Sequence, residues 1–214
     1  MISLEKITIN NLIKNLLQED LPEFYELRNT IENFTPWHTK ESAFDHTLLV
    51  LEELEKLFQQ ASAEILDYLD QKLNGGYKRK QLLYIATVLH DIGKPETLTT
   101  EGEKAYCPGH EEKGTEKAKT ILSRFYLSQE EKTHILNIIR YHGVFSVEST
   151  EKDPKLRFED LKKQHPSIFL DLVLLEIADT LGCQVNSEGK QEQEWMISFY
   201  QEQISHFFNN VNPI

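Results

Sequence analysis

The sequence predicts an all-α fold, a helical bundle in a single domain, and three observations indicate it. Leu, Glu, Lys and Gln, which favour helices, are abundant, whereas alternating runs of β-branched residues are scarce. Only nine glycines and seven prolines occur, so long stretches carry no helix breaker. The 214 residues are enough to bury one sizeable core without disulfides or structural metals.

Apolar residues at helical spacing and breaks between them define the expected elements. In chain order these are two short helices within 9–33, a loop at 34–38, and helices over about 45–68 and 80–90. They continue with a loop at 96–109, helices at 110–125 and 128–141, an irregular polar stretch at 144–166 with at most a short helix, and helices over about 167–181 and 192–208.

Several helix ends carry recognisable stop and start signals. The helix over 80–90 should end in the run Asp91-Ile92-Gly93-Lys94-Pro95, because Gly and Pro stand where a helix stops. Ser128 with Glu131 three residues on is a capping box, which predicts a helix start. Gly143 should end that helix.

Composition excludes several classes of protein. A net charge of −12 disfavours an extensive nucleic-acid interface, which needs clustered Lys and Arg. No run of about 18 apolar residues predicts a membrane span, and the first residues do not form a signal peptide. The two cysteines, Cys107 and Cys183, are too few for a disulfide framework or a Cys-rich zinc cluster. We therefore expect a cytoplasmic protein.

Four polar side chains project from faces that should be buried. His46, His90, His142 and Asp179 each lie three, four or seven residues from aliphatic side chains, so each shares a helix face with them. Any one of these could be a core residue with a hydrogen-bonding partner, and His134 could be a spare ligand beside His142. Four such helices together favour a metal site, since imidazole and carboxylate bind divalent transition metals and a buried unpaired charge is costly.

Three more residues can complete this site. Asp91 follows His90 directly, and adjacent helical residues point about 100° apart, so both can reach one ion only if that ion lies near the backbone. The second carboxylate oxygen of Asp91 can then bind another ion. His110 starts a helix after Pro108-Gly109. Gly114, one turn later, either lets that backbone approach the site or serves helix packing alone.

These residues, in this order, resemble the HD superfamily of metal-dependent phosphohydrolases. The resemblance covers about residues 36–183, and it is most similar to the HD domains of bacterial tRNA nucleotidyltransferases. It is carried by three runs: His90-Asp91-Ile92-Gly93-Lys94-Pro95, Gly109-His110-Glu111, and Ala178-Asp179-Thr180-Leu181-Gly182. The nucleotidyltransferase head is missing, because the double glycine at 75–76 lacks the carboxylate pair that such a head requires.

The resemblance implies a set of metal ligands and an activity. His46, His90, Asp91 and Asp179 would bind one divalent ion, and His110 with His142 would add a second, bridged by Asp91. The metal would be Fe, Mn, Ni, Mg or Zn. The implied activity is a phosphomonoesterase or phosphodiesterase that attacks a nucleotide or other small phosphate ester through a metal-bridging hydroxide.

Two further residues have roles that the sequence leaves open. Lys94, three residues after Asp91, is either a catalytic and substrate-binding cation or a solvated lysine in a turn. His38 either lines the mouth of the pocket, where it would bind substrate, or is an ordinary surface histidine.

The chain divides into an N-terminal helical extension at 1–35 packed on the core, a metal-binding HD domain at 36–185, and a C-terminal helix at 186–214. The expected partner is a small phosphorylated substrate, and we expect no interaction with a membrane. The acidic stretch 188–194 and the last helix serve either a homodimer or ordinary packing. Two alternative functions are a diiron oxygenase on the same ligands and a non-catalytic regulatory or binding module stabilised by metal.

Overall fold

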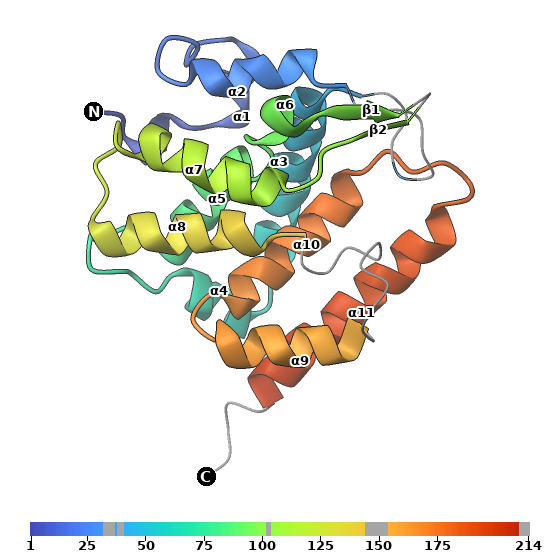
Figure 1. Ribbon diagram of the computed structural model, residues 1–214. Helices are drawn as coiled ribbons and strands as arrows, with labels where there is room; N and C mark the ends of the chain where they lie inside the picture. The colour runs from blue at the N-terminus through green and yellow to red at the C-terminus, as the bar shows by residue number, and fades with distance from the viewer. Residues whose placement is uncertain (32–36, 38–40, 102–103, 144–153, 210–214) are drawn as a thin grey trace.

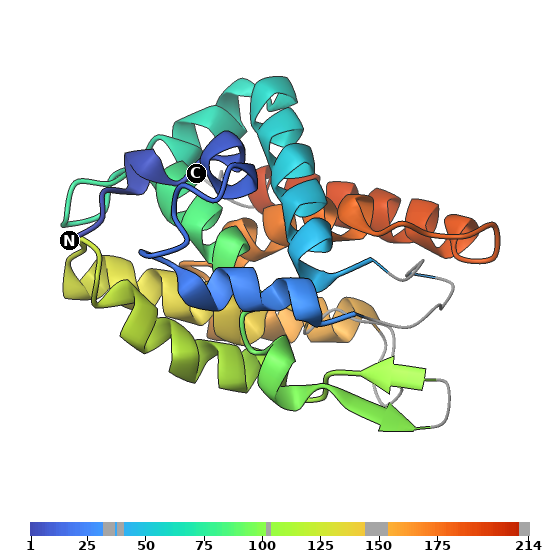
Figure 2. The ribbon, with the colours of Figure 1, turned by 90° about the horizontal axis from the view of Figure 1, so that it is seen from above.

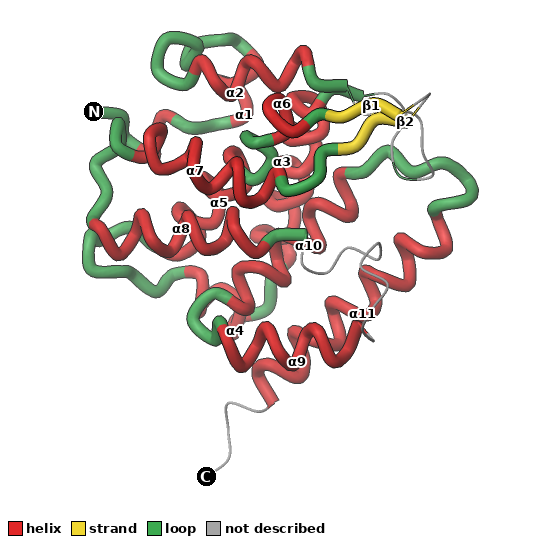
Figure 3. The backbone as a smooth tube through the Cα atoms, viewed as in Figure 1, coloured by secondary structure: helices red, strands yellow, loops and turns green. Residues whose placement is uncertain are grey.

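The predicted all-helical fold is confirmed in the computed structural model, which describes residues 1–31, 37, 41–101, 104–143 and 154–209. Helices make up most of this part of the chain, and one short antiparallel hairpin projects from it (Figure 1, Figure 3). No helix in these ranges has both the length and the apolar character needed to cross a bilayer.

The elements follow the predicted order closely. The helices are α1 (Ile9–Ile13), α2 (Pro22–Glu26), α3 (Ala43–Gln60), α4 (Ala63–Leu69), α5 (Arg79–Leu89), α6 (Lys94–Thr97), α7 (His110–Leu122), α8 (Gln129–Tyr141), α9 (Pro154–Gln164), α10 (Phe169–Gly182) and α11 (Lys190–Asn209). The hairpin pairs β1 (Thr99–Glu101) with β2 (Lys104–Tyr106), so that Thr99 lies opposite Tyr106.

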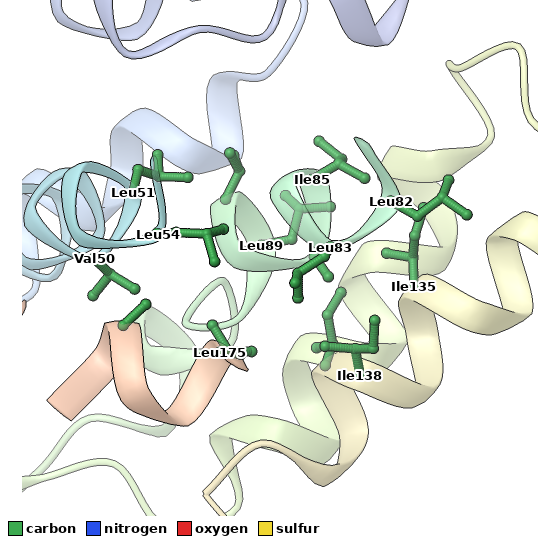
Figure 4. Packing of buried hydrophobic residues seen from close by; sticks show 14 of the residues in the cluster. Val50, Leu51, Leu54, Leu82, Leu83, Ile85, Leu89, Ile135, Ile138 and Leu175 are labelled. Atoms are coloured by element: carbon green, nitrogen blue, oxygen red, sulfur yellow. The ribbon is translucent and has the colours of Figure 1, made fainter. Parts of the chain in front are cut away.

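The central core lies between α3, α5, α8 and α10. Leu54 of α3, Leu89 of α5, Ile138 of α8 and Leu175 of α10 are fully buried, and their side chains meet in this apolar layer (Figure 4). Burying such a side chain contributes about 1.5–3 kcal/mol. The predicted metal ligands except His110, which begins α7, lie on these four helices or directly after them, so core packing sets the positions of those side chains.

The two ends of the chain pack onto this centre. Leu12 of α1 and Phe24 of α2 are fully buried in the same core, and the N-terminal helices cover one side of the bundle (Figure 1, Figure 2). On another side, α9 and α11 pack together through Phe158 and Phe199, whose ring centroids lie 4.8 Å apart. The division of the chain at residues 35 and 185 stays a prediction.

The helix predicted over 45–68 is in fact two helices, and this prediction was wrong. The backbone is extended at Ala61 (φ −64°, ψ 145°) and α4 begins after Ser62. The turn redirects the chain so that the Tyr68 hydroxyl donates to Asp171 Oδ2 over 2.7 Å. No Gly or Pro marks the break, so helical periodicity alone runs across it.

Regular structure also occurs in the predicted loop 96–109 and in the stretch 144–166, which was expected to be irregular with at most a short helix. The stretch 96–109 holds the end of α6 and the hairpin, in which the β-branched Thr99 and Thr100 favour a strand. The stretch 144–166 holds α9, an ordinary helix of 11 residues that begins with Pro154, a residue suited to the first helical position. The predicted loop at 34–38 falls mostly outside the described residues.

A backbone contact between Gly93 and Gly114 brings α7 to the end of α5. A Cβ atom on Gly93 would lie 2.2 Å from the His110 carbonyl oxygen and 2.4 Å from Gly114 N. Only two glycines allow the chains to approach so closely. Gly114 therefore serves both helix packing and the approach of this backbone to the site, because the packing that it allows places His110 beside Asp91.

We predict that Gly93→Ala destabilises the protein by about 1–3 kcal/mol, because the added methyl group forces the two backbones apart. Gly114→Ala is the matched comparison, since its Cβ would meet its nearest neighbour at 3.3 Å and should cost less. Urea unfolding of both variants measures the difference. Equal stability of Gly93→Ala and the native protein would contradict the contact.

Candidate metal centre

Helices α3, α5 and α10 bring three of the predicted ligands together. His46 lies in the first turn of α3, His90 caps the end of α5, and Asp179 lies in the last turn of α10. His46 Nε2 is 2.8 Å from Asp179 Oδ1, and His90 Nε2 is 3.8 Å from the same oxygen. We call these three residues group A; one ligand atom from each lies within 4.8 Å of the others.

A second group assembles around Asp91, just after α5. Asp91 Oδ1 lies 3.4 Å from Nε2 of His110, the first residue of α7, and 3.9 Å from Nε2 of His142, the C-cap of α8. The two imidazole nitrogens are 3.2 Å apart. These three residues form group B and also satisfy the 4.8 Å limit.

The Asp91 carboxylate lies between the two groups. Its Oδ2 is 3.3 Å from His90 Nε2 and 3.9 Å from His46 Nε2, whereas its Oδ1 faces group B. Neighbouring ligands about 2.1 Å from one metal ion are separated by roughly 3.0–3.4 Å. The observed separations lie around this range, so each group could hold an ion and Asp91 could serve both.

Backbone carbonyls orient three of the imidazole rings. Nδ1 of each ring hydrogen-bonds to the carbonyl oxygen three residues earlier: His90 to Thr87 (2.6 Å), His110 to Cys107 (2.8 Å) and His142 to Ile139 (2.7 Å). Because a carbonyl oxygen only accepts, Nδ1 must carry the proton and donate it. In the neutral ring Nε2 then carries a lone pair directed at the centre, which is the usual arrangement of metal-binding histidines.

This arrangement leaves lone pairs that need a positive charge. With both Nδ1 atoms donating, the Nε2 atoms of His110 and His142 face each other as two acceptors, unless a proton or a cation lies between them. His90 Nε2 is buried and makes no hydrogen bond within the described residues. Buried polar atoms are rarely left in this state. The donor set therefore fits divalent metal ions.

Burial and neighbouring charges set the protonation of the centre. Burial lowers the pKa of His90 to about 4, so this ring is neutral at physiological pH. Burial also opposes protonation of His142, but the nearby carboxylate of Asp91 outweighs it and raises the pKa of His142 to about 9. Burial alone would raise the pKa of Asp91, yet His90 and Lys94 hold that pKa well below its usual range.

The group A carboxylate behaves in the same way. Burial would raise the pKa of Asp179, but the hydrogen bond and charge of His46 lower it below its ordinary value. For His46, burial favours the neutral ring, and the hydrogen bond and charge of Asp179 more than compensate, so its pKa is raised. The two aspartates are therefore ionised at neutral pH and attract cations.

The remaining predicted residues have different outcomes. Lys94 is buried, and its Nζ lies 2.9 Å from Asp91 Oδ2, so it is not a solvated lysine in a turn. His38 lies outside the described residues. His134 is eight residues before His142 on α8, about 12 Å along the helix axis. It contacts Asp171 instead, with 3.5 Å between its Nε2 and Asp171 Oδ2.

The sequence reasoning missed one buried carboxyl group near the centre. Glu176 of α10 is 5% exposed, and its Oε1 accepts a hydrogen bond from Gly143 N over 2.8 Å. Burial raises its pKa to about 8. A visible signal was available, since Glu176 interrupts an aliphatic run one helical turn before Asp179.

Comparison with known proteins is consistent with this geometry. The family model of the HD domain matches residues 43–182, a range that holds every residue of groups A and B. A search of curated proteins finds no match to the chain.

We predict that metal loading at about pH 7 releases protons and that metal affinity rises between about pH 7 and pH 9. The reason is that the raised pKa of His142, about 9, keeps this ring protonated in the metal-free protein, and it must lose the proton to become a ligand. Calorimetric titration with Mn²⁺ in two buffers of different ionisation enthalpy measures the release, and His142→Gln should release fewer protons. Affinity independent of pH over this range would contradict the assignment.

Proposed function

The chain belongs to the HD-domain family, and on this premise we propose that it is a metal-dependent phosphohydrolase. We infer that it is a phosphomonoesterase or phosphodiesterase acting on a nucleotide or another small phosphate ester. The observation that carries the proposal is the position of Asp91, whose two carboxylate oxygens face two separate groups of His and Asp ligands.

Each group would hold one divalent ion. His46, His90 and Asp179 with Asp91 Oδ2 would hold the first, and Asp91 Oδ1 with His110 and His142 would hold the second. When bound, such ions lower the pKa of coordinated water towards about 7 and withdraw charge from phosphoryl oxygens. The four imidazoles suit Fe, Ni or Zn, whereas the carboxylates also suit Mn and Mg.

Lys94 would supply a fixed positive charge beside the reacting phosphate. Its ammonium group is buried and lies 2.9 Å from Asp91 Oδ2, so it stands at the boundary between the two groups. In a site shielded from water, a cation stabilises charge that develops on phosphoryl oxygens more strongly than in solution. The same charge, together with that of His90, lowers the pKa of Asp91.

Two side chains indicate how a substrate reaches the centre. The Asp179 side chain is 27% exposed and that of His110 is 18% exposed, whereas those of His46, His90, Asp91 and His142 are 3% exposed or less. A substrate would therefore approach over Asp179 and His110. A net charge of −12 favours a small ester over a long polyanion.

Some narrower expectations stay predictions. The similarity to the HD domains of tRNA nucleotidyltransferases rests on the run at 90–95 and on the other quoted motifs, and we assign no substrate from it. A homodimer through the C-terminal helix likewise stays a prediction. The oxygenase and the non-catalytic module share the same metal ligands, so turnover assays separate them from a phosphohydrolase.

We predict that Asp91→Ala loses metal and activity together, whereas Lys94→Ala keeps its metal and loses about 10²- to 10³-fold in kcat. The first change removes the shared ligand, and the second removes only the added charge. Elemental analysis beside phosphate release from a panel of phosphate esters measures both effects. Lys113→Ala is the control, because this lysine is exposed and pairs only locally with Glu116.

Full metal loading of Asp91→Ala would contradict the ligand assignment. Oxygen consumption without phosphate release would favour the oxygenase. A metal-dependent rise in Tm with no turnover of any ester would favour the non-catalytic module.

A further inference from the structure

We propose that Glu176 is a positioning residue that holds His142 in group B through the backbone of Gly143, a role that rests on the proposed function. Glu176 does not reach the centre itself. Its Oε1 accepts the Gly143 N–H over 2.8 Å, and Gly143 directly follows His142. The contact ties the end of α8 to α10.

His142 needs such a tie because it is the residue at which α8 ends. Its N–H still bonds to the Ile138 carbonyl over 3.0 Å, but its backbone is already extended (φ −63°, ψ 154°). Gly143 then takes a left-handed conformation (φ +73°), which favours glycine. At a helix end, the position of a ring depends on what holds the next peptide unit, and here that peptide bonds to Glu176.

Gly143 is enclosed on a second side by α7. A Cβ atom on Gly143 would lie 3.0 Å from Glu111 Oε1, so Gly143 packs against the residue that follows His110. The end of α8 is thus held between α7 and α10, the helices that supply His110 and Asp179. This arrangement places Nε2 of His142 3.2 Å from Nε2 of His110 and completes group B.

The cost of burying Glu176 supports a specific role. Glu176 is buried, no Lys or Arg forms an ion pair with it in the described part of the chain, and burying a carboxyl group without a cationic partner is costly. An aliphatic side chain would serve packing alone at least as well. Glu176 also precedes Asp179 by three residues, so one turn of α10 supplies a ligand to group A and orients a ligand of group B.

The test compares metal binding by Glu176→Ala and Glu176→Gln with the native protein. Mn²⁺ is titrated by calorimetry, and bound metal is counted by elemental analysis. Mutation of a residue that orients a metal ligand typically lowers metal affinity by about 10- to 100-fold. We expect Glu176→Ala to lower the affinity for one of the two ions by that factor and to leave the affinity for the other unchanged. Glu176→Gln should bind both normally, because its amide oxygen accepts the same hydrogen bond.

Glu131→Ala is the matched control, a buried glutamate on α8, the helix that ends at His142. Glu131 is fully buried, and its carboxylate accepts hydrogen bonds from the backbone N–H groups of Ser128 and Tyr77, at the far end of α8. Its loss should lower Tm without changing metal binding. If Glu176→Ala does not fold, Glu176→Asp replaces it, because a side chain shorter by one methylene should show the same loss of affinity.

Three outcomes would overturn the role of Glu176: native metal binding by Glu176→Ala, equal loss of metal by Glu131→Ala, or failure of Glu176→Gln to bind the second ion. A native protein that binds two ions but hydrolyses no phosphate ester would contradict the proposed function alone. The two failures are distinguishable, because one is measured as metal affinity and the other as turnover.

Discussion

The Asp91 carboxylate, buried between two groups of imidazoles, is the interaction on which the rest of the site depends. Its side chain is 3% exposed, and a charge so far from water requires compensation from its surroundings. Lys94 provides part of that compensation at 2.9 Å, and the histidines on either side direct their ring nitrogens towards it. The protein therefore concentrates negative charge and lone pairs at one point, which is the condition for binding divalent cations.

Helix packing rather than local sequence delivers these groups to one place. The ligands come from α3, α5, α7, α8 and α10, and most of them lie at or near a helix end. His90, His110 and His142 all lie at helix ends. There Nε2 of each ring faces the site, while Nδ1 hydrogen-bonds to the backbone carbonyl three residues earlier. The glycine contact between residues 93 and 114 then brings α7 close enough for His110 to join.

Much of the site could be predicted because its residues interrupt regular patterns. His46, His90 and Asp179 stand on apolar helix faces, where a polar side chain needs a partner, and the order of the motifs indicated the family. The break at Ala61 was missed because no Gly or Pro marks it, and the hairpin at 99–106 was missed because each of its strands has only three residues. Glu176 interrupts the same aliphatic run as Asp179 but was missed, and its partner Gly143, 33 residues away along the chain, is visible only in the packed structure.

The central claim is that Asp91 bridges two metal ions, and anomalous X-ray scattering from crystals grown with Mn²⁺ tests it most directly. We expect two anomalous peaks, one on each side of the Asp91 carboxylate. One peak should lie among His46, His90 and Asp179, and the other between His110 and His142. Mn²⁺ bound elsewhere, with no peak beside Asp91, would contradict the account.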